Sequence, residues 1–172
     1  MYEIHHFFTP LLDHFDDFDN NDWFLHPVIT LENAKNYRDY AHFTKNVETL
    51  NAVYDRLQKI ATDYLTLNLF GRKTGRKFIQ KIQEKLTLSD LLSYNNQVRQ
   101  TILSEMNIKT ADFISHRSFV KHELQHTLHE FYENNGQKTP TAMIYTDDEV
   151  LMLENCSHHI VQNYLHRIEK TA

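Results

Sequence analysis

The sequence predicts a mainly α-helical fold, with about five helices in one compact domain (residues 1–172) and little or no sheet. Apolar residues recur every three or four positions over long stretches, as in helices that bury one face. Only three glycines and three prolines are present, and many-stranded sheets need more turn residues than these. A chain of 172 residues, of which 41% are hydrophobic, suits one domain with its own core.

Apolar spacing and helix start signals place the five helices at residues 31–64, 78–86, 87–106, 110–133 and 146–168. Thr146 and Glu149 have the spacing of a capping box, which sets the start of the last helix. Short strands are suggested at Pro27–Leu31 and Ala142–Tyr145, and we expect residues 1–30 to be irregular.

Charge is distributed unevenly along the chain. The net charge is −5, and residues 1–30 carry −6 because they contain six acidic residues and no Lys or Arg, so the remainder carries −5 − (−6) = +1. Aromatic residues alternate with these acids: Phe7, Phe8, Phe15, Phe18, Trp23 and Phe24 lie among Glu3, Asp13, Asp16, Asp17, Asp19 and Asp22. One hypothesis is that this acidic segment is a docking surface for a basic protein partner. The other, which we favour, is that the aromatic rings fold back onto the core.

A basic cluster follows in the middle of the chain. It consists of Arg72, Lys73, Arg76, Lys77, Lys81 and Lys85. Such a cluster can contact phosphates, but a chain that is acidic overall is a poor general nucleic-acid binder. We therefore favour a solvated helix face.

Cysteine content and hydropathy limit the cellular setting. Cys156 is the only cysteine, so no disulfide forms within these residues and no cysteine-based zinc finger is present. No apolar run is long enough to span a bilayer, and the first residues lack the pattern of a secretory signal. The expectation is a cytoplasmic protein without a membrane partner.

The strongest chemical signal is the motif His122-Glu123-Leu124-Gln125-His126, or HExxH. On a helix, histidines four residues apart lie on one face, so both imidazoles can bind one Zn²⁺. The glutamate between them can act as general base on a metal-bound water. The motif predicts a zinc-dependent hydrolase with Glu123 as the catalytic base.

A zinc site also needs a third protein ligand. Glu149 is better explained as a capping residue, whereas Glu154 lies on the border of the predicted last helix's inner face and can reach a neighbouring helix. His158, one turn further on, is an alternative ligand or an orienting residue. Glu154 could equally be a carboxylate in a salt bridge at the edge of the core.

The segment from Phe119 to Glu154 resembles the HExxH zinc metallopeptidases, and most closely the gluzincin-like ImmA-type peptidases that accompany phage repressors. The resemblance implies that His122, His126 and Glu154 are zinc ligands and that Glu123 is the base. Only the HExxH motif carries it.

Three other readings remain open. His42 with His122 and His126 resembles the three-histidine metal site of DinB-like helical bundles. Arg117 and His122 resemble the Arg-x4-His ribonuclease motif of HEPN domains. A non-catalytic helical binding or inhibitor protein, acting through residues 1–30 or the basic cluster at 72–85, is the chief alternative to the hydrolase.

Overall fold

The computed structural model describes residues 2–16 and 23–171, and it shows an α/β protein rather than a mainly helical one. Four strands form a mixed sheet in the order β2-β1-β3-β4. The strands are β1 (Glu3–Phe8), β2 (Trp23–Pro27), β3 (Thr141–Tyr145) and β4 (Val150–Glu154). The predicted fold class, about five helices with little or no sheet, is therefore wrong.

Seven α-helices and two 3-10 helices are present in the described part of the chain. The α-helices are α1 (Leu31–Tyr40), α2 (Val47–Asn68), α3 (Arg72–Lys85), α4 (Asn96–Glu105), α5 (Thr110–Arg117), α6 (Glu123–Glu133) and α7 (His158–Thr171). The 3-10 helices are η1 (Leu88–Ser93) and η2 (Ser118–Val120). None of the described helices is long and apolar enough to cross a membrane.

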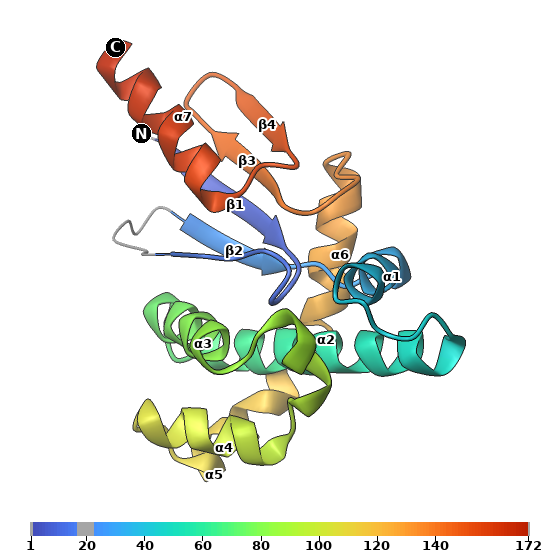
Figure 1. Ribbon diagram of the computed structural model, residues 1–172. Helices are drawn as coiled ribbons and strands as arrows, with labels where there is room; N and C mark the ends of the chain where they lie inside the picture. The colour runs from blue at the N-terminus through green and yellow to red at the C-terminus, as the bar shows by residue number, and fades with distance from the viewer. Residues whose placement is uncertain (1, 17–22, 172) are drawn as a thin grey trace.

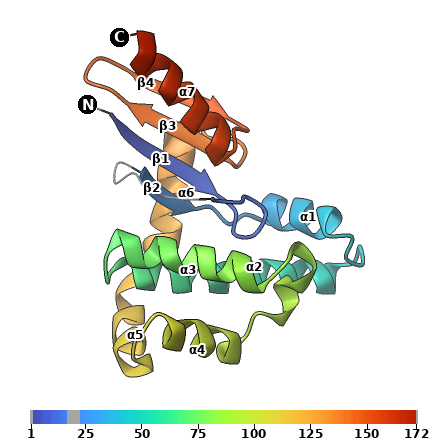
Figure 2. The ribbon, with the colours of Figure 1, turned by 60° about the vertical axis from the view of Figure 1, so that its left-hand side comes forward.

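The sheet is built from the two ends of the chain, and the helices α1 to α6 are inserted between β2 and β3. Strand β1 pairs with β2 in parallel and with β3 in antiparallel orientation, and β3 and β4 form an antiparallel hairpin. Helix α7 covers one face of the sheet, α6 lies on the other, and α2 to α5 form a helical body beyond the β2 edge (Figures 1 and 2).

The N-terminal aromatic residues are part of the core. Phe7, Phe8, Phe15 and Trp23 are each 2% exposed or less. Of the aromatic residues proposed as a docking surface, Phe24 is half-buried, and Phe18 lies outside the described residues. This agrees with rings folded onto the core. The acidic residues Asp17, Asp19 and Asp22 also lie outside the described residues.

The first part of the helix predicted over 146–168 is instead a β-hairpin, and only its second part, in α7, is helical. The Glu149 backbone N–H donates to Thr146 Oγ1 at 3.0 Å, which is the hydrogen bond that a helix cap would make. Here it closes the turn between β3 and β4, and the Thr146 N–H donates back to the Glu149 carbonyl at 2.9 Å. Thr and Ser side chains stabilise both turns and helix starts, so the local pattern does not distinguish the two.

Candidate binding pocket

The structure does not assemble the predicted zinc ligands. His122 is the residue before α6, so the helix begins inside the HExxH motif, and both His122 and His126 are exposed. Glu154 ends β4, an edge strand, and is not on a helix at all. Across residues 2–16 and 23–171, no group of three or more His, Cys, Asp or Glu side chains is arranged to hold a metal ion. The helical setting assumed for Glu154 is thus wrong, and zinc binding itself stays a prediction.

The key residues of the DinB-like and HEPN-like hypotheses also lie in other structural positions than those hypotheses require. His42 lies in a turn after α1 with a φ of 57°, not on a helix facing the HExxH segment. Arg117 ends α5, and its Nη1 lies 3.3 Å from Oδ1 of the buried Asp63. This ion pair gives Arg117 a structural role in the helical body, and the HEPN-like ribonuclease stays an untested prediction.

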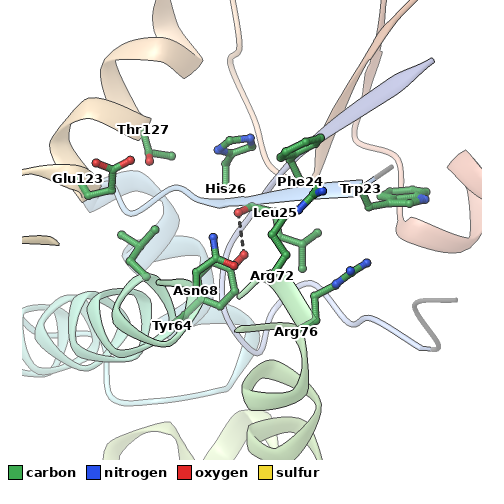
Figure 3. A pocket seen from close by; sticks show the side chains of 11 residues that line it. Trp23, Phe24, Leu25, His26, Tyr64, Asn68, Arg72, Arg76, Glu123 and Thr127 are labelled. Carbon is green, nitrogen blue, oxygen red and sulfur yellow. Dashed lines mark hydrogen bonds between the residues drawn. The ribbon is translucent and has the colours of Figure 1, made fainter. Parts of the chain in front are cut away.

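One predicted site residue, Glu123, does line a concave site. The pocket lies where β2 meets α2, α3 and α6 (Figure 3). Its lining consists of Trp23, Phe24, Leu25, His26, Tyr64, Leu65, Asn68, Arg72, Arg76, Glu123 and Thr127. Aromatic, amide and basic side chains from segments far apart in sequence therefore meet at one place.

The basic wall of the pocket comes from the start of α3. Gly71 precedes the helix with a φ of 120°, a conformation that favours glycine, and lets the chain turn sharply from α2 into α3. The first turn of α3 contains no acidic residue. The partial positive charge of the helix N-terminus therefore adds to the charges of Arg72 and Lys73.

Arg72 is held by an aromatic ring of the sheet. Its guanidinium carbon lies 4.2 Å from the centre of the Phe24 ring, a cation–π contact. Phe24 in turn stacks on His5, with ring centres 5.0 Å apart. Figure 3 shows Arg72 rising from α3 toward Phe24. The cation is thus positioned at the mouth of the pocket by a ring that is itself fixed within the sheet.

The floor of the pocket is formed by α2. Tyr64 Oη donates a hydrogen bond of 2.9 Å to the Leu25 carbonyl and fastens α2 to the outer side of β2. A Cβ at position 75 would lie 2.8 Å from Asn68 Oδ1, so Gly75 allows α3 to approach α2 closely at this point. Figure 3 shows the Asn68 amide between Glu123 and Arg72, with its nitrogen directed toward β2.

On the sheet side of the pocket, the lining residue His26 is hydrogen-bonded to a second histidine, His5. His26 Nε2 lies 2.9 Å from His5 Nδ1, and His5 Nε2 lies 2.8 Å from Glu3 Oε1. Burial lowers the pKa of His26 to about 3, with a further contribution from the nearby His5. His26 is therefore neutral at physiological pH and contributes a hydrogen-bonding ring rather than a charge.

The basic cluster predicted at 72–85 is divided by the structure into two halves. At the end of α3, Lys81 Nζ lies 2.9 Å from Glu84 Oε2, and Lys85 Nζ lies 2.6 Å from Glu105 Oε1. Lys73 and Lys77 are exposed, and neither makes an ion pair with another described residue. The lysines of α3 that have no described ion-pair partner thus lie in its first half, the half that contributes Arg72 to the pocket. These cations are evident from the sequence, but the pocket is not, because it depends on β2.

Together the fold and the pocket define an α/β protein with a mixed four-stranded sheet, a large helical insertion and a basic, partly aromatic pocket at the sheet edge. No family model and no curated protein matches the chain. Its architecture is similar to the solved structure of the cytosolic disulfide reductase DsbM from Pseudomonas aeruginosa, with a TM-score of 0.58 over 99% of this chain and 100% of that one. The sequence identity is 12%, so the likeness concerns the fold alone.

The single cysteine separates this sequence from dithiol chemistry. Cys156 is half-buried in the loop between β4 and α7, and its N–H donates to the Pro140 carbonyl at 3.1 Å. A disulfide reductase that uses its own dithiol needs two neighbouring cysteines, and these 172 residues contain one. The likeness in fold therefore comes without such a cysteine pair in these 172 residues.

Proposed function

We propose that this protein is a non-catalytic binding protein whose pocket receives an acidic side chain of a partner protein. The observation that carries the proposal is the convergence of Arg72, the Asn68 amide and the Phe24 ring at one concave site. The chain has a fold like that of a disulfide reductase but no cysteine pair, which favours a recognition role over dithiol exchange.

The chemistry of the pocket mouth selects for a carboxylate. Arg72 provides a planar guanidinium that pairs with carboxylates through two hydrogen bonds, and the Asn68 amide offers further N–H donors. Phe24 offers an apolar surface for the methylene groups that precede a side-chain carboxylate. Lys73 and Lys77, both exposed, extend the positive field beyond the pocket.

The pocket also disfavours a long polyanion. Glu123 lies on the wall contributed by α6, so a second negative group placed deep in the pocket would meet a like charge. The net charge of −5 further opposes a nucleic acid, whose binding depends on many phosphate contacts. An isolated acidic side chain on a folded or extended protein segment fits this distribution better.

A binding measurement with charge-reversal variants tests the proposal. The probe is a fluorescein-labelled peptide of glutamates interspersed with phenylalanine, and the readout is fluorescence anisotropy at low ionic strength. Arg72→Glu should weaken binding by about tenfold or more, since it replaces an attractive charge with a repulsive one. Lys109→Glu, which makes a similar charge change at the exposed start of α5, is the matched control and should have little effect.

Two results would overturn the proposal. Equal losses in both variants would mean that the peptide senses only the overall charge of the protein. Tighter binding of a single-stranded DNA of the same charge, abolished by the same Arg72 substitution, would identify the pocket as a nucleic-acid site instead.

A further inference from the structure

The two edges of the sheet differ in whether other parts of the fold cover them. At the β2 edge, Pro27 ends the strand, and the Leu25 carbonyl is occupied by Tyr64 Oη at 2.9 Å. Strand β4 pairs with β3 on its inner side, and on its outer side no backbone hydrogen bond joins it to another described residue. One edge is covered by helices, and the other is open.

The open strand lacks the features that normally protect an edge. Proteins block such edges with lysine, proline, a β-bulge or a covering element, because the unpaired N–H and C=O groups otherwise accept another strand. Strand β4 reads Val-Leu-Met-Leu-Glu, and its five residues pair with β3 in unbroken register, without a bulge. Val150 is 55% exposed and Met152 is 41% exposed. An apolar, regular and open edge is suited to strand addition.

We propose that β4 pairs with the β4 strand of a second copy of this chain, in antiparallel orientation about a twofold axis at Met152. This inference does not depend on the proposed function of the pocket, which lies at the opposite edge of the sheet. Joining the two edges would give one continuous eight-stranded sheet.

The sequence of β4 is self-complementary in this register. Met152 faces Met152 of the second copy, and Leu151 faces its Leu153, on the side of the sheet that packs against α7. Val150 faces the second copy's Glu154. The two Glu154 carboxylates lie at opposite ends of the paired strands, with Cα atoms separated by roughly 14 Å at 3.4 Å per residue. Within the paired strands, no acidic residue directly faces another.

The surroundings of β4 support the same partner. A twofold axis perpendicular to the sheet places both α7 helices on the same face, and α7 has an exposed apolar stripe formed by Ile160, Tyr164 and Ile168. This stripe is apolar surface on the helix that packs against the Leu151 and Leu153 face of the sheet, and it adds to what the five strand residues supply. In addition, the acidic turn at 147–149 of one copy extends past Glu154 of the other, toward the start of its α7. The first turn of α7 contains no acidic residue, so its partial positive charge faces this turn.

Disulfide trapping tests the register directly. In a Cys156→Ser background, Met152→Cys places two thiols across the twofold axis, where paired Cα atoms lie about 4.5–5.5 Å apart, within the range for a disulfide. Glu154→Cys is the matched control, because its two thiols stay roughly 14 Å apart. We expect the Met152→Cys protein to form a covalent dimer on mild oxidation at least about tenfold faster than the Glu154→Cys protein, consistent with its proximity.

Sedimentation velocity of the unmodified chain over a dilution series provides the second readout. The expected result is a concentration-dependent dimer that Met152→Lys dissociates, since two lysines would then face each other in the edge. Val47→Lys, a substitution at a residue that is 71% exposed in α2, should leave the dimer intact. A monomer at all concentrations, a dimer indifferent to Met152→Lys in a folded protein, or equal crosslinking rates would each overturn the proposal.

Discussion

The Arg72 guanidinium lies over the Phe24 ring, with 4.2 Å between its central carbon and the ring centre. This contact joins the first residue of α3 to the second residue of β2, so it connects the helical body to the sheet. It also fixes the cation at the mouth of the pocket. Both the packing of α3 and the proposed recognition of a carboxylate depend on it.

Replacing the ring should separate these two roles. Phe24→Leu keeps an apolar side chain but removes the cation–π contact, which contributes about 0.5–1 kcal/mol at a partly exposed site. We expect that decrease in the unfolding free energy, measured by urea denaturation, and a several-fold weaker affinity for the acidic peptide. Phe24→Tyr retains the ring and should behave like the unmodified protein. A Phe24→Leu protein that binds normally would show that Arg72 needs no ring to hold it.

The helical body is held together by a buried carboxylate. Asp63 is fully buried, and its Oδ2 accepts a hydrogen bond of 2.7 Å from Tyr94 Oη, while the guanidinium nitrogens of Arg99 and Arg117 lie 3.5 and 3.3 Å from Oδ1. Removing one member of a buried charge network leaves the others uncompensated. Asp63→Ala should therefore lower the unfolding free energy by about 3 kcal/mol.

Tyr94→Phe is the comparison for Asp63→Ala, because it removes one hydrogen bond and keeps the ring. Its expected cost is about 1 kcal/mol. If both variants unfold at the same urea concentration as the original chain, the cluster does not stabilise the helical body.

Lowering the pH should destabilise the fold, because buried histidines stay neutral in the folded chain while they become protonated in the unfolded chain. Burial lowers the pKa of His6 from 6.5 to about 3, and the neighbouring His158 adds to this effect. His6 binds a proton below pH 6.5 in the unfolded chain, but only below about pH 3 in the folded chain. Its contribution to the free energy of unfolding is therefore complete above pH 6.5 and decreases as the pH falls from 6.5 to about 3. The limiting slope is about 1.4 kcal/mol per pH unit for each such histidine.

His6→Phe should reduce the slope of the unfolding free energy against pH on the acid side, measured by urea denaturation at a series of pH values. Neither ring nitrogen of His6 has a hydrogen-bond partner among residues 2–16 and 23–171, so an apolar ring of similar shape should not reduce stability at neutral pH. His159→Phe, at an exposed position on α7, is the control and should retain the full slope. Asp13 acts in the opposite direction because burial raises its pKa to about 7, so the variants are compared with each other at each pH. An unchanged slope in His6→Phe would contradict the assignment.

The exposed HExxH histidines should contribute little to stability. Because His122 and His126 are solvent-exposed, we expect His126→Ala to change the unfolding free energy by less than about 0.5 kcal/mol, with or without a chelator. Metal analysis of untagged protein completes the test. Near-stoichiometric zinc that disappears in His126→Ala but remains in His129→Ala would restore the metal site.

Helices were more predictable than strands in this chain. The helical spacing of residues 47–64 predicts one apolar stripe, made of Val47, Leu50, Tyr54, Leu57, Ala61 and Tyr64. Leu57, Ala61 and Tyr64 are buried as predicted, whereas Val47 is 71% exposed. Thr87 and Asp90 form a capping box, as expected of a helix start. The single helix predicted over 31–64 is two helices, α1 and α2, because the chain turns at 41–46. The start of α6 at Glu123 is a tertiary feature that helical spacing alone does not predict.

Of the four strands, the sequence suggested only the one at Ala142–Tyr145, which is β3 (Thr141–Tyr145). The other strands were missed because they carry no clear alternation. Strand β1 is buried on both faces along most of its length, so Ile-His-His-Phe-Phe lacks the in-out pattern of a half-exposed strand. Missing β1 and β2 also hid the pocket, since Phe24 and His26 acquire their positions only from the pairing of these strands. The basic residues of α3 were identified from sequence, but their convergence with a ring of the sheet required the fold.

Nuclear magnetic resonance of ¹⁵N-labelled protein, titrated with the acidic peptide, tests the pocket most directly. The account predicts saturable shifts of the Asn68 side-chain amide and of the Gly71 and Gly75 backbone amides, all absent in Arg72→Glu. Shifts confined to other surfaces, or identical shifts in the Arg72→Glu protein, would contradict it.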